Sequence, residues 1–222
     1  MHWQQVLVIT AATATVLTAV RCGGTPERRL VPLPAPRLKG DLSLEEAIAG
    51  RRSSRSFADR PLTLEQLSQL AWSAQGVTEK RRGFRTAPSA GALYPLELYF
   101  VTPKATYHYV PAEHHFEVHR EGDLRAGLAD AALGQECVRD AAVNVVITAI
   151  FSRTTGKYGA RGKTYVHMEA GHVGQNLLLQ ATALGLAHVP VGAFHDGDVS
   201  RALDLPDRHE PVYIICIGHR PE

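Results

Sequence analysis

The chain has 222 residues, of which 45% are hydrophobic and 21% are charged, so it can form one globular domain with a substantial core but not two. Its formal net charge of +2 is too small for a nucleic-acid-binding surface, and we expect no nucleic-acid partner. The three cysteines are widely spaced and form no CxxC pair, which predicts neither a disulfide framework nor a zinc finger.

The beginning of the chain differs in composition from the rest. Residues 6–20 carry no charge, as is typical of the apolar part of a secretory signal, although Arg21 departs from the small residues that precede a lipidated cysteine such as Cys22. Residues 1–22 therefore have two interpretations: a signal or membrane-targeting segment of an exported bacterial protein, or a buried helix or misassigned start in a cytoplasmic one. Residues 23–40 contain four prolines and predict an extended linker, and the folded domain is expected over residues 41–222.

Capping boxes predict the first two helices. The sequence SLEE from Ser43 opens a helix that ends at Gly50, and TLEQ from Thr63 opens a second helix that ends at Gly76. The pattern then predicts a strand at 96–101, a hairpin over 107–119, a helix at 124–134, a buried strand at 143–150, a polar glycine-rich loop at 154–163, a long helix at 164–184 and a last strand at 212–217. Helices mixed with a few strands in this way indicate an α+β domain.

A basic cluster follows the first predicted helix. Arg51, Arg52 and Arg55, with Ser53 between them, offer several charge-assisted hydrogen-bond donors to a phosphate or another polyanion. A solvated basic turn would have the same composition, and the cluster alone does not distinguish the two interpretations.

A second candidate is the segment Pro88–Gly91, with the sequence PSAG, which precedes the strand at 96–101. Its small residues let backbone N–H groups approach a flat or anionic ligand. The alternative is a loop that only leads into the strand.

The long predicted helix carries a third candidate, a polar stripe made by Glu169, His172 and Asn176. These side chains either form an interior network or face a ligand or a second subunit. His167 and His172 are five positions apart, not the four that bring two ligands onto one helix face, so we predict no metal site.

These segments together resemble the nitroreductase family of FMN proteins, most closely its SagB/ThcOx-type dehydrogenase branch. The resemblance covers about residues 42–218 and is carried by SLEEAIAGRRSSRSF, RTAPSAGALYPLELYFV, KYGARGKTYVHMEAGHVGQNLLLQATALGL, VPVGAF and VYIICIGHR, in the family's order. It implies a nitroreductase-like FMN-binding fold, in which helices flank a mostly antiparallel central sheet. It also implies a homodimer with FMN at the subunit interface.

The resemblance also assigns roles to individual residues. Arg51, Arg52, Ser53 and Arg55 would hold the flavin phosphate and ribityl chain, with a further contribution from Arg220. Pro88, Ser89, Ala90 and Gly91 would lie against the isoalloxazine, and Val191, Gly192 and Ala193 would approach the ring from its redox face. In azoline-oxidising members a Lys-Tyr pair assists proton removal, a role that would fall here to Lys157 and Tyr158.

The implied activity is transfer of a hydride between FMN and a small organic substrate such as a quinone or a nitro compound. The chain has no GxGxxG fingerprint, so NADH or NADPH would bind only transiently as electron donor. Two alternatives stay open: an azoline dehydrogenase that forms thiazoles or oxazoles in a modified peptide, and a flavin-binding module without turnover.

Overall fold

The computed structural model describes residues 29–221. The predicted signal or targeting segment, with Cys22, lies outside these residues. Within them, no helix is both long enough and apolar enough to span a bilayer.

The first two helices begin where the capping boxes predict. They are α1 (Leu44–Gly50) and α2 (Leu64–Gln75). At the start of α1 the backbone N–H of Glu46 donates to Ser43 Oγ at 3.2 Å, and the N–H of Ser43 donates to Glu46 Oε2 at 2.8 Å. Each box satisfies backbone donors that the helix itself leaves unpaired, so local sequence is enough to specify both helix starts.

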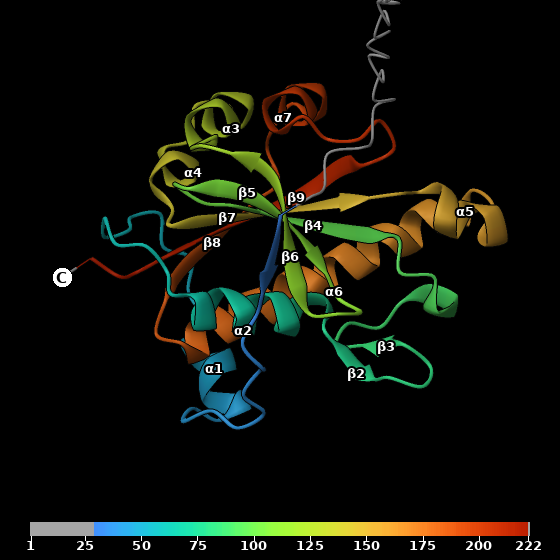
Figure 1. Cartoon of the computed structure of the whole chain (residues 1–222), viewed down its shortest axis with the longest axis horizontal. Coiled ribbons are helices and arrows are strands. Elements are labelled where there is room, and N and C mark those ends of the chain that lie inside the picture. Colours follow the sequence, from blue (N-terminus) through green and yellow to red (C-terminus); the bar gives the residue numbers. More distant parts are fainter. Residues whose placement is uncertain (1–28, 222) are drawn as a thin grey trace, which may run out of the picture.

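A seven-stranded sheet in the order β1-β6-β5-β4-β7-β9-β8 forms the middle of the molecule (Figure 1). Its strands are β1 (Leu30–Pro32), β4 (Leu96–Val101), β5 (Ala105–Val110), β6 (His115–Glu121), β7 (Val143–Ala149), β8 (Ala187–Val191) and β9 (Glu210–Gly218). All neighbouring pairs are antiparallel, which confirms the predicted α+β class and the mostly antiparallel sheet. The predicted hairpin is β5 and β6, and two short strands, β2 (Val77–Glu79) and β3 (Phe84–Arg85), pair separately.

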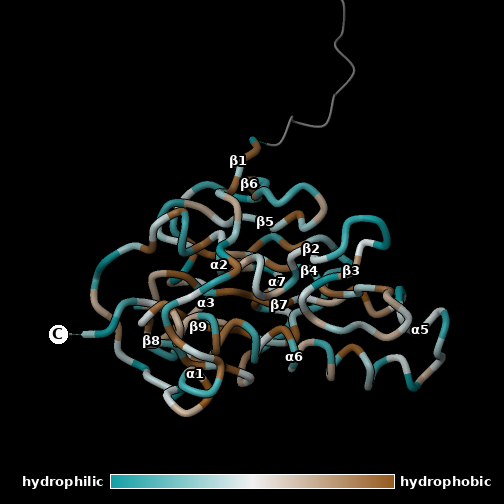
Figure 2. The backbone as a smooth tube through the Cα atoms, turned by 90° about the horizontal axis from the view of Figure 1, so that it is seen from below, coloured by the Kyte–Doolittle hydropathy of each residue, from teal (hydrophilic) through white to brown (hydrophobic). Residues whose placement is uncertain are grey.

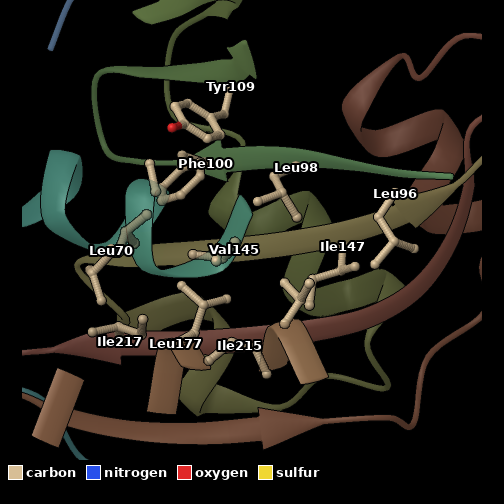
Figure 3. Packing of buried hydrophobic residues seen from close by; sticks show 14 of the residues in the cluster. Leu70, Leu96, Leu98, Phe100, Tyr109, Val145, Ile147, Leu177, Ile215 and Ile217 are labelled. Carbon is tan, nitrogen blue, oxygen red and sulfur yellow. The ribbon is translucent and has the colours of Figure 1, made fainter. Parts of the chain in front are cut away.

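Helices cover both faces of this sheet (Figure 1). One face packs against α2 and the long helix α6 (Arg161–Ala183), and the other packs against α3 (Arg125–Ala131), α4 (Glu136–Asp140) and α7 (Asp196–Leu203). Along β4, Leu98 and Phe100 belong to the same core cluster as Leu177 of α6 (Figure 3), whereas Tyr99 between them belongs to the core on the opposite face. This alternation is the period of two that a strand buried on both faces requires.

The proline-rich segment lies against the domain from Arg29 onward. β1 extends the sheet at its outer edge, with Val31 opposite Phe116, and the Ser68 hydroxyl on α2 donates to the carbonyl of Pro34 at 2.6 Å. Figure 2 shows that hydrophobic residues are concentrated in the middle of the molecule, along β7 and β9, and that hydrophilic residues lie in the peripheral loops.

The prediction of a loop over residues 154–163 is wrong. The chain forms α5 (Ser152–Tyr158), and α6 begins at Arg161, three residues before the predicted start. The break between the helices is Gly159, which has a positive φ of 57° that a helix cannot contain. A Cβ on Gly162 would lie 2.8 Å from the Cα of Thr155, so this glycine serves the close packing of the two helices.

The helix predicted over 124–134 is too long for a related reason. α3 ends at Ala131, because Leu133 and Gly134 have positive φ values of 60° and 72°. The short helix α4, which the sequence did not indicate, follows this turn.

Candidate functional site

Apart from Val191–Ala193, the predicted site residues form two groups, which lie toward opposite ends of α6 (Figure 1). We call Arg51, Arg52, Ser53, Arg55 and Arg220 the arginine group, and Pro88–Gly91 with Lys157 and Tyr158 the loop group. A Cβ on Gly50, just before the arginine group, would lie 3.7 Å from Thr182 Cγ2, near the end of α6. The loop group lies beside α5 and the first half of α6.

The arginine group is positioned by the open edge of the sheet. Residues 51–55 run beside the edge strand β8, where the backbone N–H of Ser54 donates to the carbonyl of His188 at 2.8 Å. The N–H of Ala58 donates to the carbonyl of His219 at 3.0 Å, which brings the end of the chain next to the same segment. The order of the strands therefore explains how Arg220 comes to lie near residues 51–55.

Two of these arginines face one buried histidine. Burial, and after it the guanidinium groups of Arg51 and Arg220, together lower the pKa of His188 to about 4, so both charges lie close to the imidazole. His188 Nε2 lies 2.9 Å from the hydroxyl of Thr182, which itself donates to the carbonyl of Leu178 at 2.8 Å. Nε2 is therefore the donor, and the imidazole is neutral with an unprotonated Nδ1.

The other two arginines point elsewhere. Arg52 Nη1 donates to the carbonyls of Ala49 and Arg51 at 3.1 and 2.8 Å, at the end of α1. Arg55 lies near Cys137, whose thiol has its pKa lowered to about 7, first by a hydrogen bond with the Cys216 thiol and then by this guanidinium. The basic cluster is thus spread along the edge of β8 and does not converge on one point.

Within the part of the chain that the structure describes, no carboxylate neutralises the charge of the arginine group. Among residues 29–221, none of the salt bridges within 4.0 Å involves Arg51, Arg52, Arg55 or Arg220. Most of the other arginines in residues 29–221 have a carboxylate partner. An uncompensated set of guanidinium groups along a sheet edge is chemically suited to a phosphate.

The segment Val191–Ala193 continues along the same edge. Val191 is buried in the core that packs against α3, α4 and α7. Gly192 and Ala193 are exposed, and the carbonyl of Ala193 accepts from Gln135 Nε2 at 3.0 Å. They lie three to five residues beyond His188, which corresponds to about 10–16 Å at about 3.3 Å per strand residue.

The structure brings the two parts of the loop group into contact. Gly91, within the short 3₁₀ turn η1 (Ala90–Ala92), has a φ of 64°. A Cβ at this position would lie 2.8 Å from the hydroxyl of Tyr158 and 3.0 Å from Nζ of Lys157. The glycine thus allows the Lys-Tyr pair at the end of α5 to lie over the loop, a juxtaposition that the sequence did not predict.

Behind this loop lies a buried network that the sequence revealed only in part. Arg85 Nη1 donates to Gln75 Oε1 at 3.1 Å, and Gln75 Nε2 donates to Glu169 Oε1 at 3.3 Å. Burial raises the pKa of Glu169, and the nearby side chains of Ser89 and Gln75 oppose this rise, so the Ser89 hydroxyl lies close to the carboxylate. Glu169 belongs to the polar stripe predicted from the sequence, and Arg85 begins the motif RTAPSAGALYPLELYFV, but nothing in the sequence links them to Gln75, the last residue of α2.

The polar stripe of α6 divides between two environments. Glu169 is only 3% exposed, and Asn176 Nδ2 donates to the carbonyl of Ser73 at 3.0 Å, so the interior-network interpretation is confirmed for these two residues. His172, by contrast, is exposed. Within residues 29–221, no three His, Cys, Asp or Glu side chains are arranged to hold a metal ion.

The sequence matches the family model described as the nitroreductase family over residues 48–219. It is 40% identical over 188 residues to a protein of Methanocaldococcus jannaschii whose name places it among the nitroreductases, and the match covers 82% of this chain and 93% of that protein. A crystal structure from Ralstonia eutropha, also named as a nitroreductase, superimposes with a TM-score of 0.80 at 31% identity and covers 90% of this chain and 93% of the other.

A more distant relative has a different role in its name. The microcin B17-processing protein McbC of Escherichia coli is 27% identical over 157 residues, which is 66% of this chain. The match spans 57% of McbC, so more than a third of that protein has no counterpart in the aligned region.

Proposed function

The chain belongs to the nitroreductase family of oxidoreductases, and we propose that it is an FMN-dependent enzyme that transfers a hydride between bound flavin and a small organic substrate, such as a quinone or a nitro compound. The observation that carries this proposal is the open edge of β8. Uncompensated arginines line one end of this edge, and accessible backbone follows at its other end, at Gly192 and Ala193.

The residues present fit an FMN. Its phosphate would bind to Arg51 and Arg220 beside His188, and its isoalloxazine would lie about 10–16 Å further on, at Val191–Ala193. When bound, FMN supplies the hydride chemistry, and NADH or NADPH would reduce it. The chain's own contribution is to neutralise the phosphate and to offer backbone groups to the ring edge.

The position of the loop group supports a site shared between two copies of the chain. Ser89 contacts α6 at Glu169, whereas the arginine group meets α6 at Thr182, about 20 Å away along the helix axis at about 1.5 Å per residue. The ribityl chain that joins the flavin ring to its phosphate is shorter than this distance. We propose a homodimer in which the loop group of one chain covers the flavin held by the arginine group of its partner.

Exposed apolar side chains beside the arginine group are consistent with such a dimer. Leu38, Leu44 and Ile48 are 79%, 60% and 54% exposed, and they lie on α1 or just before it. A monomer would leave these side chains in water, whereas a second copy seated over α1 and the end of α6 would cover them.

Subunit complementation tests the shared site. Arg51→Ala should disable the arginine group, and Gly91→Trp should disable the loop group by displacing Lys157 and Tyr158. If each site uses both chains, co-expression of the two inactive variants gives mixed dimers with one intact site, which restores about a quarter of wild-type activity. If all site residues act within one chain, mixing restores nothing.

A second candidate function is azoline oxidation in a peptide. It is favoured by the contact of Lys157 and Tyr158 with Gly91, which puts a base and a hydroxyl on the loop proposed to cover the flavin, and by the similarity to McbC, a protein named for peptide processing. In this reaction the substrate loses a hydride to FMN and a proton to a base, a role for which Lys157 and Tyr158 are placed suitably.

The visible spectrum of the purified protein separates these functions. A flavin band that bleaches with NADH or NADPH and recovers with a quinone or nitro compound supports the first function. A band that bleaches only with an azoline-containing peptide supports the second, and Lys157→Ala should then lower kcat at least about a hundredfold. A band that no donor bleaches indicates a binding module, and a protein that cannot be loaded with FMN refutes the proposal.

A further inference from the structure

We propose that Glu169 is a positioning residue whose carboxylate closes a ring of interactions and thereby holds residues 88–94 in the shape that covers the flavin. This inference rests on the proposed function for its consequence in catalysis. The ring itself can be tested without any flavin.

The ring passes through five side chains from three parts of the chain. Arg85 donates to Gln75 on α2, and Gln75 donates to Glu169 on α6. The Ser89 hydroxyl lies close enough to the Glu169 carboxylate to lower its pKa. Ser89 Oγ then accepts from the backbone N–H of Tyr94 at 2.9 Å. The ring closes where Tyr94 Oη accepts from the N–H of Arg85 at 3.1 Å and the Arg85 guanidinium lies 4.4 Å from the centre of the Tyr94 ring.

The direction of the hydrogen bonds identifies Glu169 as the acceptor in this ring. Gln75 must use its amide oxygen for Arg85, so it presents N–H groups to Glu169. Ser89 accepts from a backbone N–H, so its own hydroxyl proton is free to point at the carboxylate. A carboxylate can accept from both donors at once, whereas an apolar side chain would leave the buried Gln75 amide and the half-buried Ser89 hydroxyl without this partner.

The conformation held by this ring is one that the sequence does not favour by itself. Besides Gly91, both Ala92 and Tyr94 have positive φ values, 52° and 44°, which L-residues with a Cβ rarely adopt. Such a backbone persists only when its surroundings over-determine it. The contacts with Ser89 and Tyr94 supply this constraint, since they attach both ends of the turn to α2 and α6.

The same turn also fixes the Lys-Tyr pair. Arg153 on α5 donates to the carbonyl of Tyr94 at 3.0 Å and pairs with Glu97 at 2.7 Å. Lys157 and Tyr158 follow on the same helix and lie over Gly91. Movement of the turn would therefore change the position of both side chains relative to a flavin.

Hydrogen exchange of the flavin-free protein tests the ring directly. Glu169→Leu, which keeps the approximate volume but removes both acceptors, should speed exchange of the Tyr94 amide about tenfold, because this N–H depends on the orientation of Ser89. The matched control is Gln180→Ala, which removes another polar contact between α6 and α2, the 3.0 Å bond from Gln69, without touching the loop. Its exchange over residues 86–95 should equal that of wild type.

The holoenzyme gives the second measurement. In Glu169→Leu we expect kcat to fall about tenfold and the absorption band of bound flavin to shift, with the melting temperature within a few degrees of wild type. Glu169→Gln keeps one acceptor and should give a smaller change of the same sign, and it serves as the test if Glu169→Leu does not fold.

Each outcome decides the proposal. Unchanged exchange in Glu169→Leu, or equally fast exchange in Gln180→Ala, overturns the ring. Faster exchange with an unchanged flavin spectrum and kcat overturns the positioning role. A wild-type protein that binds no flavin refutes the proposed function instead, and the exchange comparison still decides whether Glu169 holds the turn.

Discussion

The arginine group and the loop group are organised in opposite ways. The arginine group has several cations along a sheet edge and no carboxylate partner among residues 29–221, and four of its five residues are exposed. The loop group is backed by the partly buried ring of interactions described above, in which the donors of Arg85, Gln75 and Tyr94 each have an acceptor.

This difference indicates what completes each half of the site. Cations held near one another without counter-charge repel, and binding of an anion relieves the repulsion, so the arginine group gains most of its order from a ligand. The loop group has its constraints already built into the fold and can present a fixed surface before a ligand arrives. Changes in the first group should therefore affect ligand affinity, and changes in the second should affect geometry and rate.

The largest effect is expected from removing the phosphate-binding charge. Arg51→Ala combined with Arg220→Ala should weaken FMN binding more than about a hundredfold, because each charge-assisted hydrogen bond contributes about 1.5–3 kcal/mol. Binding of riboflavin, which lacks the phosphate, should change little. Fluorescence titration of the apoprotein with both ligands measures this difference.

The control for that titration is Arg139→Ala, since Arg139 is half exposed and its charge is already paired with Asp130 at 2.8 Å. It should bind FMN as wild type does. Equal losses of FMN and riboflavin affinity in the double variant would contradict a phosphate role and indicate a general collapse of the edge.

An intermediate effect is expected for stability in acid. The pKa of His188 is lowered from 6.5 to about 4, so between these values the unfolded chain binds a proton that the folded chain does not, and stability falls as the pH falls through this window. The loss from this group between pH 7 and pH 5 is roughly 2 kcal/mol. Asparagine does not titrate, so His188→Asn should not show this part of the loss in unfolding free energy when urea unfolding is compared at pH 7 and pH 5.

Bound FMN should sharpen the same measurement. Besides burial, the positive charges of Arg51 and Arg220 keep the His188 pKa low, and a bound phosphate would offset part of these charges. Wild type saturated with FMN should therefore lose less stability in acid. Identical pH slopes for wild type and His188→Asn would mean that His188 titrates normally and is not close to both arginines.

The fold was predictable wherever local chemistry determines an element. Ser43 and Thr63 cap their helices in the way that their neighbours at the third helical position indicate, and the largely apolar, β-branched run at 143–150 indicated a buried strand. The misread segment was the one with glycines at 156, 159 and 162. Only Gly159 breaks the helix, and Gly162 serves a contact with α5 that sequence spacing does not report.

The site was predictable as a set of residues but not as an arrangement. Small residues at Pro88–Gly91 suggested a close approach by a ligand, yet within the chain the space over Gly91 is occupied by Lys157 and Tyr158. This contact joins residues more than sixty positions apart, and it depends on the helical form of α5. The separation of the arginine and loop groups along α6 is likewise a property of the tertiary structure alone.

The smallest effect is expected at the contact between the loop and the Lys-Tyr pair. Gly91→Ala adds a methyl group at a φ of 64°, 2.8 Å from the Tyr158 hydroxyl, so it should cost about 1 kcal/mol in stability and move flexible side-chain ends aside. We expect kcat to fall severalfold while FMN affinity changes less than about twofold, because the phosphate-binding residues are untouched. The matched control is Gly171→Ala on α6, where the added Cβ meets nothing within 4 Å and should stabilise the helix slightly. Loss of FMN affinity in Gly91→Ala as large as in the double arginine variant would contradict the division of roles between the two groups.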